Sequence, residues 1–206
     1  MRAGSPRSIY LWSVRMSHFI VLLGSCLNLI GTWRYCRAIL AGRVQPNLVT
    51  WIMWALAPLI GVAAELYSGV TWAVLPVFMA GFGPLCVTCV ALLTHHSTWV
   101  PRPRDYACGV FSFLALILWQ ITKDPDIAIL FAVLSDGAAL LPTLFKTWTH
   151  PDSETPVPFA LAVCSSLSAL PVIEHWTFAS LAFPLYLMTA NSIMVLTIER
   201  RRFLTV

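Results

Sequence analysis

Three polar side chains stand near the centres of long apolar segments, where a polar group is costly and normally has a partner or a function. Asp136 lies midway along the apolar segment 127–145. Asn28 lies near the middle of segment 17–40, and Asn191 lies near the middle of segment 178–198. A carboxyl and two amides can exchange hydrogen bonds with a small polar molecule. These residues are therefore the first candidates for a binding site.

Asp136 has two interpretations. An ionised carboxylate in hydrocarbon is too costly without a partner, so the group either becomes neutral or meets water and a cation. The nearest basic residue along the same segment, Lys146, lies ten residues further on, which is a rise of about 15 Å in a helix. In the functional interpretation Asp136 binds a solute or a proton. In the other it is a neutral structural acid, hydrogen-bonded to a neighbouring helix.

Asn28 belongs to a stripe of small and polar residues that includes Gly24, Gly31 and Thr32. Such a stripe suits close helix packing as well as the lining of a cavity. Both interpretations of Asn28 stay open at this stage, and the same choice applies to Asn191.

The segment 48–66 places Trp51, Trp54, Pro58 and Glu65 on one face at helical spacing. In a sugar site an indole ring would stack on the solute, whereas tryptophans in a membrane protein also gather at the membrane–water interface. Both interpretations of the two tryptophans remain open. We expect Glu65, near the end of the segment, to reach water.

Prolines inside apolar helices are hinge candidates, because proline removes a backbone hydrogen bond. Three of them fall in the apolar segments at positions that could bend a helix, namely Pro142, Pro58 and Pro184.

The sequence gives little support for metal binding or catalysis. Cys86-x-x-Cys89 lies inside an apolar segment with no further metal ligands at recognisable spacing, and His95-His96 lies among arginines at a segment end. We expect neither pair to bind metal. The sequence has no catalytic, Walker or dinucleotide-binding motif, so we expect no enzyme, no cofactor and no metal.

Composition indicates a protein built for the bilayer. The chain is 58% hydrophobic and only 11% charged, against about 25% charged in soluble domains. Nine tryptophans suit a protein with two membrane interfaces. The net charge of +4 is too small and too scattered for nucleic-acid binding.

The apolar segments predict an all-α membrane protein with seven transmembrane helices. A spanning helix needs about 20 mostly apolar residues, and we expect spans at 17–40, 48–66, 71–93, 106–122, 127–145, 156–173 and 178–198. They divide the chain into an N-terminal tail (1–16), a first three-helix bundle (17–93), a loop and linker helix (94–122), a second three-helix bundle (123–198) and a C-terminal tail (199–206).

The two bundles align when the sequence is shifted by 136 − 28 = 108 residues. Because a single linker helix separates them, they would run in the same direction, a parallel repeat found in some transporters. The shift pairs Asn28 with Asp136, Trp51 with Phe159, Pro76 with Pro184, Phe78 with Tyr186 and Gly83 with Asn191.

This plan resembles the PQ-loop/SWEET superfamily of small seven-helix transporters over about residues 17–202. The local match is LLPTLFKTWTHPDSET (140–155), with a partner in YCRAILAGRVQPNLVTWIMW (35–54). The family's Pro-Gln pair is Pro142-Thr143 here, and the segment 17–40 has no proline. The resemblance implies a 3+1+3 helix arrangement and a pocket asparagine at Asn191, whose counterpart in the first bundle is Gly83.

Together these features predict a facilitator or proton-linked transporter of a small polar solute, possibly a sugar, that works by alternating access. We expect the solute to be neutral or cationic, because the charge at mid-membrane is negative. The alternative is a seven-helix membrane receptor or accessory protein. Expected partners are the solute and the lipid bilayer, with a homo-oligomer possible and no nucleic acid.

Basic residues predict the orientation, since Lys and Arg gather on the cytoplasmic side. With seven spans, the side that carries the C-terminus has nine of them, and the other side has Lys123, Arg2, Arg7 and Arg15. We therefore expect an inner-membrane protein with the C-terminus in the cytoplasm and the N-terminus outside. Translation starting at Met16 would remove the three arginines that oppose this orientation.

The orientation is testable with two labels. A C-terminal tag should be accessible only from the cytoplasm, and a cysteine placed at Ser68, in the turn after the second segment, should react with an impermeant reagent in intact cells. Labelling of that cysteine only after permeabilisation would invert the orientation.

Overall fold

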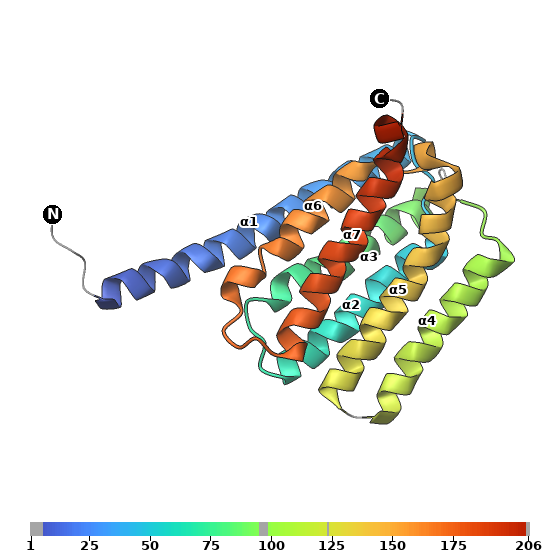
Figure 1. Ribbon diagram of the computed structural model, residues 1–206. Coiled ribbons are helices and arrows are strands. Elements are labelled where there is room, and N and C mark those ends of the chain that lie inside the picture. Colours follow the sequence, from blue (N-terminus) through green and yellow to red (C-terminus); the bar gives the residue numbers. More distant parts are fainter. Residues whose placement is uncertain (1–5, 95–98, 123, 205–206) are drawn as a thin grey trace.

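The computed structural model describes residues 6–94, 99–122 and 124–204. In these ranges the chain forms helices and no strand (Figure 1). The α-helices are α1 (Pro6–Leu40), α2 (Leu48–Tyr67), α3 (Val74–Thr94), α4 (Pro103–Thr122), α5 (Pro125–Thr149), α6 (Pro156–Leu167) and α7 (Phe178–Leu204), with short 3-10 turns η1 (Pro151–Ser153) and η2 (Leu170–Val172).

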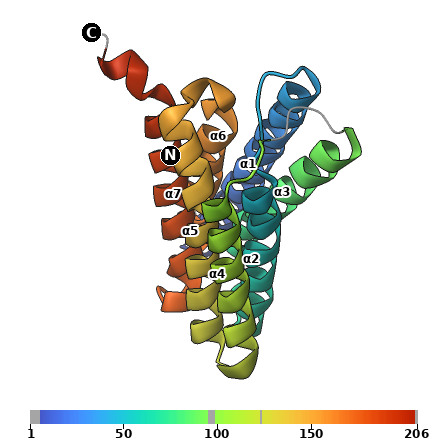
Figure 2. The same ribbon diagram turned by 90° about the vertical axis from the view of Figure 1, so that its right-hand side faces the viewer.

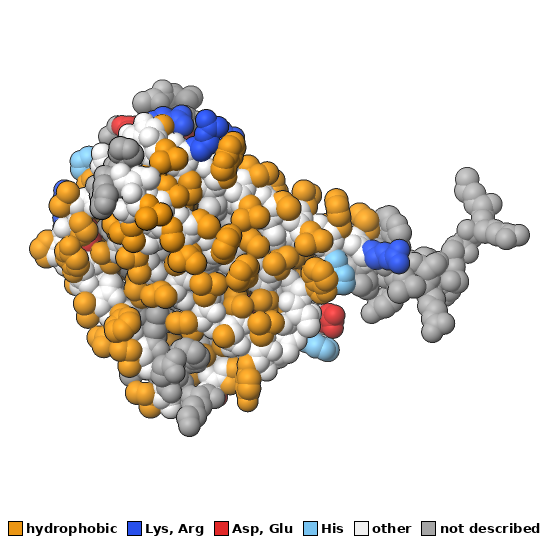
Figure 3. Space-filling view, turned by 180° about the vertical axis from the view of Figure 1, so that it is seen from behind, with side chains coloured by type: hydrophobic (Ala, Val, Ile, Leu, Met, Phe, Trp, Pro, Cys, Tyr) orange, Lys and Arg blue, Asp and Glu red, His pale blue; other side chains and the backbone are white. Residues whose placement is uncertain are grey.

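The structure is that of a helical membrane protein, as the sequence predicts. Five helices, α1, α2, α3, α5 and α7, are long and apolar enough to cross a bilayer. The stretch Pro156–Val172 is apolar but shorter, and the apolar part of α4 begins only after Arg104 and Asp105. Hydrophobic side chains cover most of the face seen in Figure 3.

Helices α1, α2 and α3 are called the first group below, and helices α5, α6 and α7 the second group. In the first group α3 packs against both α1 and α2, and in the second α7 packs against both α5 and α6. The groups meet where α1 packs on α6 and α2 packs on α5. Helix α4 lies outside, against α5 and α2 (Figures 1 and 2).

Helix α1 is longer than the sequence analysis expected. The segment 1–16 is predicted as a tail, but the helix begins at Pro6 and projects from the bundle (Figure 1). Proline is favourable at the first helical position, and no glycine or proline interrupts the stretch from there to Ser17. The helix ends at Leu40, and Gly42 (φ 65°) then reverses the chain in a conformation that glycine adopts without strain.

The sixth span is interrupted, where the sequence predicts one helix over 156–173. Helix α6 ends at Leu167, and η2 follows. Pro171 cannot donate a backbone hydrogen bond. The Ser166 and Ser168 hydroxyls also turn back onto the carbonyl oxygens of Ala162 (2.9 Å) and Ser165 (2.6 Å). Such side-chain bonds to backbone oxygens compete with the regular helical pattern.

Side-chain caps fix the starts of α2 and α5. Asn47 accepts a hydrogen bond from the backbone N–H of Val49 (3.2 Å), and its amide nitrogen donates to Asp105 of α4 (3.1 Å). Asp124 accepts from the N–H groups of Asp126 (2.9 Å) and Ile127 (3.3 Å). Each cap satisfies helix N–H groups that lack an intrahelical partner. The Asn47–Asp105 bond also attaches the linker helix to α2.

Helix α2 approaches α7 closely at Gly61. A β-carbon at this position would overlap the ring of Phe183, which is fully buried. Glycine is therefore required for α2 and α7 to pack at this distance.

Replacing Gly61 with alanine should destabilise the protein by about 1–3 kcal/mol, because the buried Phe183 ring has no free space to move into. The thermal unfolding midpoint in detergent measures this loss. Gly137→Ala is the matched control, since its added β-carbon would meet the Tyr186 ring at an ordinary 3.7 Å. Equal shifts for the two variants would contradict the packing argument.

Candidate functional site

A cavity of about 70 Å³ lies between the two three-helix groups. Its walls come from α1, α2, α3, α5, α6 and α7, and none of its lining residues belongs to α4. All five residues that the sequence predicts for solute binding line it: Asn28, Trp51, Trp54, Asp136 and Asn191. Three segments far apart in the sequence thus bring their central polar groups to one place.

Asp136 has a partner on α7. The Tyr186 hydroxyl donates to a carboxyl oxygen of Asp136 at 2.7 Å, and the Asp136 side chain is almost fully buried. Among the described residues no cation pairs with it. The phenol satisfies one lone pair of the carboxyl and leaves further acceptor capacity directed to the cavity.

The two tryptophans form an aromatic wall of the cavity. Trp51 packs against Tyr35 with ring centroids 4.6 Å apart and against Trp54 at 5.3 Å. The Trp54 indole N–H donates to the backbone oxygen of Asp136 (3.3 Å), whereas the Trp51 indole N–H is buried with no partner. Both rings are buried among the helices and do not lie on the outer surface of the bundle.

The two asparagines differ in their bonding. Asn191 donates from its amide nitrogen to the Leu187 carbonyl oxygen of its own helix at 2.8 Å. Asn28 is buried beside Gly83, where a β-carbon would lie 2.6 Å from the Thr32 hydroxyl and 3.4 Å from the Asn28 oxygen. A side chain larger than glycine at position 83 would therefore displace the polar stripe of α1.

All three predicted hinge prolines lie inside helices and are buried: Pro58 in α2, Pro142 in α5 and Pro184 in α7. None of them lines the cavity. A fourth helical proline, Pro84 in α3, does line it.

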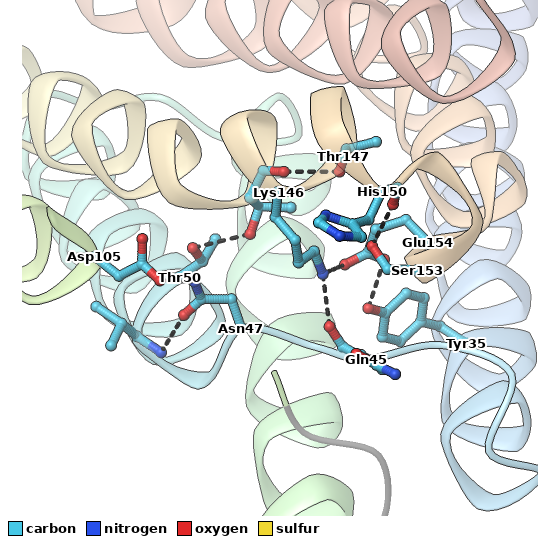
Figure 4. Close-up of polar contacts among 12 residues, drawn as sticks. Tyr35, Gln45, Asn47, Thr50, Asp105, Lys146, Thr147, His150, Ser153 and Glu154 are labelled. Carbon is cyan, nitrogen blue, oxygen red and sulfur yellow. Dashed lines mark hydrogen bonds and ion pairs between the residues drawn. The ribbon is translucent and has the colours of Figure 1, made fainter. Parts of the chain in front are cut away.

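A buried polar cluster joins the two groups at one end of the bundle, which we call the Lys146 end (Figure 4). Lys146 forms an ion pair with Glu154 and donates to the backbone oxygen of Gln45 at 2.6 Å. The Tyr35 hydroxyl donates to the second carboxyl oxygen of Glu154 at 2.7 Å. We call these four residues the latch. Lys146 lies in the last turn of α5, and its side chain is fully buried.

Two further hydrogen bonds tie the groups together beside the latch. The Thr143 hydroxyl of α5 donates to the Thr50 hydroxyl of α2 at 3.0 Å. The backbone N–H of Gln45 donates to the Ser153 oxygen at 3.0 Å. Because Tyr35 and Trp51 line the cavity and lie next to these bonds, the Lys146 end is closed by polar contacts.

The opposite end, which we call the Glu65 end, is closed by apolar packing. A cluster of buried residues from α2, α3, α5 and α7 fills it: Ala64, Val77, Ala128, Ile129, Ala132, Ala179, Phe183 and Leu187. Glu65 lies at this end and is 1% exposed, and neither of its carboxyl oxygens bonds to a described residue. The expectation that Glu65 reaches water is therefore wrong.

Sequence reasoning missed several residues of this architecture. Tyr186 was noted only as the repeat partner of Phe78, and Glu154 only as part of a polar turn. Cys86 and Cys89 lie in α3, and among the described residues no group of three or more metal ligands occurs. His95-His96 lies outside the described residues.

Comparisons with known proteins add no assignment. No family model matches the chain, and neither a curated protein nor a solved structure matches it. The fold and the cavity therefore define only a class: a helical membrane protein with a small cavity among its helices, lined by apolar side chains and a few polar ones.

Breaking the latch on one side should be strongly destabilising. Glu154→Gln leaves the buried Lys146 charge without a counter-charge, which costs about 3–5 kcal/mol. Adding Lys146→Met removes the orphaned charge, so the double variant should be more stable than the sum of the two single losses predicts.

Chemical unfolding in detergent measures the four members of this cycle. Arg104→Gln is the control, because the Arg104–Asp105 contact of 3.8 Å has an Arg104 side chain that is 44% exposed and such pairs contribute about 0–1 kcal/mol. Strictly additive losses at Lys146 and Glu154 would show that they do not act as a pair.

Proposed function

We propose that this chain is a facilitator or secondary transporter of a small polar solute, in which two parallel three-helix bundles joined by a linker helix (3+1+3) bind the solute between them. The observation that carries the proposal is the cavity, which is lined by the central polar residues of α1, α5 and α7 and by the tryptophans of α2. A polar cavity at the interface of two bundles is where alternating-access transporters hold their solute.

The packing pattern supports a repeat. Under the 108-residue shift α1 corresponds to α5, α2 to α6 and α3 to α7. The α1–α6 and α2–α5 contacts then become equivalent, and α3 and α7 each take the place between the other two helices of their bundle. The paired positions Asn28 and Asp136, Trp51 and Phe159, and Gly83 and Asn191 all line the cavity.

The size of the cavity supports movement of the bundles. Its volume of about 70 Å³ is well below the roughly 300–1,000 Å³ of pockets that hold drug-sized ligands. It has room for a few water molecules. A solute as large as a sugar requires the bundles to move apart, so this conformation is a closed one.

The cavity walls define the chemistry of the solute. Asp136 supplies acceptor oxygens, Trp51 supplies an indole N–H without a partner, and the aromatic rings supply flat apolar faces. A molecule with several hydroxyl or ammonium groups on an apolar frame matches this set. A sugar, an amino acid or a polyamine has this chemistry, whereas an anion would meet the Asp136 carboxyl.

The resemblance to the PQ-loop/SWEET superfamily leads to the same proposal. The distribution of basic residues leads us to propose an inner-membrane location with the Lys146 end and the C-terminus toward the cytoplasm. In this orientation the latch is the inner closure and the Glu65 end faces outward.

A thermal-shift screen of the purified protein against sugars, amino acids and polyamines tests the proposal. Binding stabilises a protein by about 2.7 kcal/mol when the ligand is at a hundredfold excess over its dissociation constant. Uptake of each hit into proteoliposomes then separates transport from binding. A hit that binds without being moved would favour the receptor alternative.

Asp136→Asn should weaken binding of a screened solute about tenfold or more, because a hydrogen bond to a charged group contributes about 1.5–3 kcal/mol. The protein should still fold, since asparagine keeps the shape and still accepts a bond from Tyr186. The control is Asp126→Asn, an exposed carboxyl in the first turn of the same helix. Equal affinities for the two variants would remove Asp136 from the site.

A further inference from the structure

Glu65 is a buried carboxyl that the proposed binding site does not use. It lies in the last turn of α2 and does not line the cavity. Its side chain is 1% exposed, and both oxygens are buried without a hydrogen-bond partner. A buried carboxyl without a partner is rare and calls for an explanation.

The position of Glu65 links it to α7. Gly61, one helical turn earlier on the same face of α2, lies against the ring of Phe183. Phe183 in turn packs against Tyr186 with ring centroids 6.5 Å apart, and Tyr186 holds Asp136. The apolar cluster between Glu65 and the cavity is formed in part by Phe183 and Leu187. Movement of α7 away from α2 would therefore expose Glu65 and open the cavity together.

A structural role does not account for this residue. A structural acid has hydrogen-bond partners that fix its neighbours, and Glu65 has none among the described residues. An apolar side chain of similar length would fill the same space without the desolvation penalty. The carboxyl is therefore a cost to the closed conformation.

We propose that Glu65 is a proton-binding site of the transport cycle, so that closure of the Glu65 end requires its carboxyl to take up one proton from water. In the open conformation the ionised carboxylate is hydrated. On closure water leaves, and the proton moves onto a carboxyl oxygen because the charge would otherwise be buried without compensation. This inference rests on the proposed function in that it needs the Glu65 end to open.

Among the described residues, no cation on the helices packed against α2 pairs with Glu65. Helices α3, α4, α5 and α7 pack against α2. Their described cations are Arg104, Lys146 and Arg200, which bind at the Lys146 end to Asp105, to Glu154 and to the Trp148 backbone oxygen. Their other titratable side chains are Cys86 and Cys89 on α3, Asp105, Tyr106 and Cys108 on α4, Asp126 and Asp136 on α5, and Tyr186 and Glu199 on α7.

Titratable side chains of both signs lie in the segments at this end. Asp124 and Asp126 start α5, Glu174 and His175 precede α7, and His18 of α1 stacks on Trp72. Neither oxygen of Glu65 bonds to any of them. Raising the pH therefore favours the open form, and one linked proton changes the ratio of open to closed forms by up to tenfold per pH unit.

The experiment measures opening without any solute. A reporter cysteine is placed at Ala179, which is 5% exposed in the apolar cluster at the Glu65 end. Its reaction with N-ethylmaleimide is followed in lipid nanodiscs between pH 5.5 and 8.5, by mass spectrometry on the peptide that carries it. The rate is divided by that of the Glu65→Gln variant with the same reporter. The division cancels the pH dependence of the thiol itself.

The ratio should rise with pH by up to tenfold per unit, because glutamine holds the end closed at every pH. Glu174→Gln is the matched control, an exposed glutamate at the same end, and it should behave like the unchanged protein. A ratio that stays constant from pH 5.5 to 8.5 would overturn the proposal.

A second measurement avoids the reporter, in case Ala179→Cys does not fold. The thermal midpoint of the unchanged protein should fall relative to Glu65→Gln as the pH rises, since the folded state holds a proton that the unfolded state has lost. Parallel midpoints would also overturn the proposal. Neither measurement uses a solute, so the two proposals can fail separately. If solute binding is intact but the pH dependence is absent, only the role of Glu65 is contradicted. If the pH dependence is present but no solute binds, only the proposed function is contradicted.

Discussion

The ion pair between Lys146 and Glu154 is the interaction on which the closed conformation depends. Both side chains are buried, so each would be very costly alone. Their mutual attraction offsets this only with further hydrogen bonds, which Tyr35 and the Gln45 backbone supply. These four residues come from α1, the α1–α2 loop, α5 and the segment after η1. The pair therefore holds the loops of both three-helix groups in one place.

The two ends of the bundle are closed by different physics. At the Lys146 end directional polar bonds, including the Thr143–Thr50 bond, cross between the groups. At the Glu65 end alanines and a phenylalanine pack closely, and the buried carboxyl contributes no bond. The Lys146 end opens by breaking individual polar bonds, whereas the Glu65 end opens by exposing apolar surface to water. A change in conditions can therefore weaken the contacts at one end and leave those at the other end intact.

The sequence predicted the helices and the inward-facing residues for a clear reason. A long apolar segment in a membrane protein forms a helix, and a single polar residue at its centre is costly unless it faces a partner or a cavity. For this reason Asn28, Asp136 and Asn191 could be predicted from the sequence. Contacts that depend on the relative positions of distant segments could not be predicted. Tyr35 and Glu154 are 119 residues apart. Glu65 looks in the sequence like a hydrated residue near a helix end, but packing between distant segments buries it.

The ends of α1 and α6 depend on local features of the sequence, and the predicted bounds took only some of these features into account. The run after Pro6 has no breaker, and so α1 extends through the predicted tail. In α6 the serine bonds to backbone oxygens and the nearby Pro171 compete with the regular helical pattern, and the helix ends at Leu167.

Tyr35 connects occupancy of the cavity to the state of the latch. Its ring forms part of the cavity wall beside Trp51, and its hydroxyl donates to Glu154. A ligand shifts a conformational equilibrium only through different contacts in the two states. A solute that displaces the Tyr35 ring, or accepts its hydroxyl, removes one of the bonds that compensate the buried charge of Glu154. Binding in the cavity would then weaken the contacts at the Lys146 end, although the solute does not touch Lys146. The contact between the solute and Tyr35, which differs between the two states, is what a solute-driven opening requires.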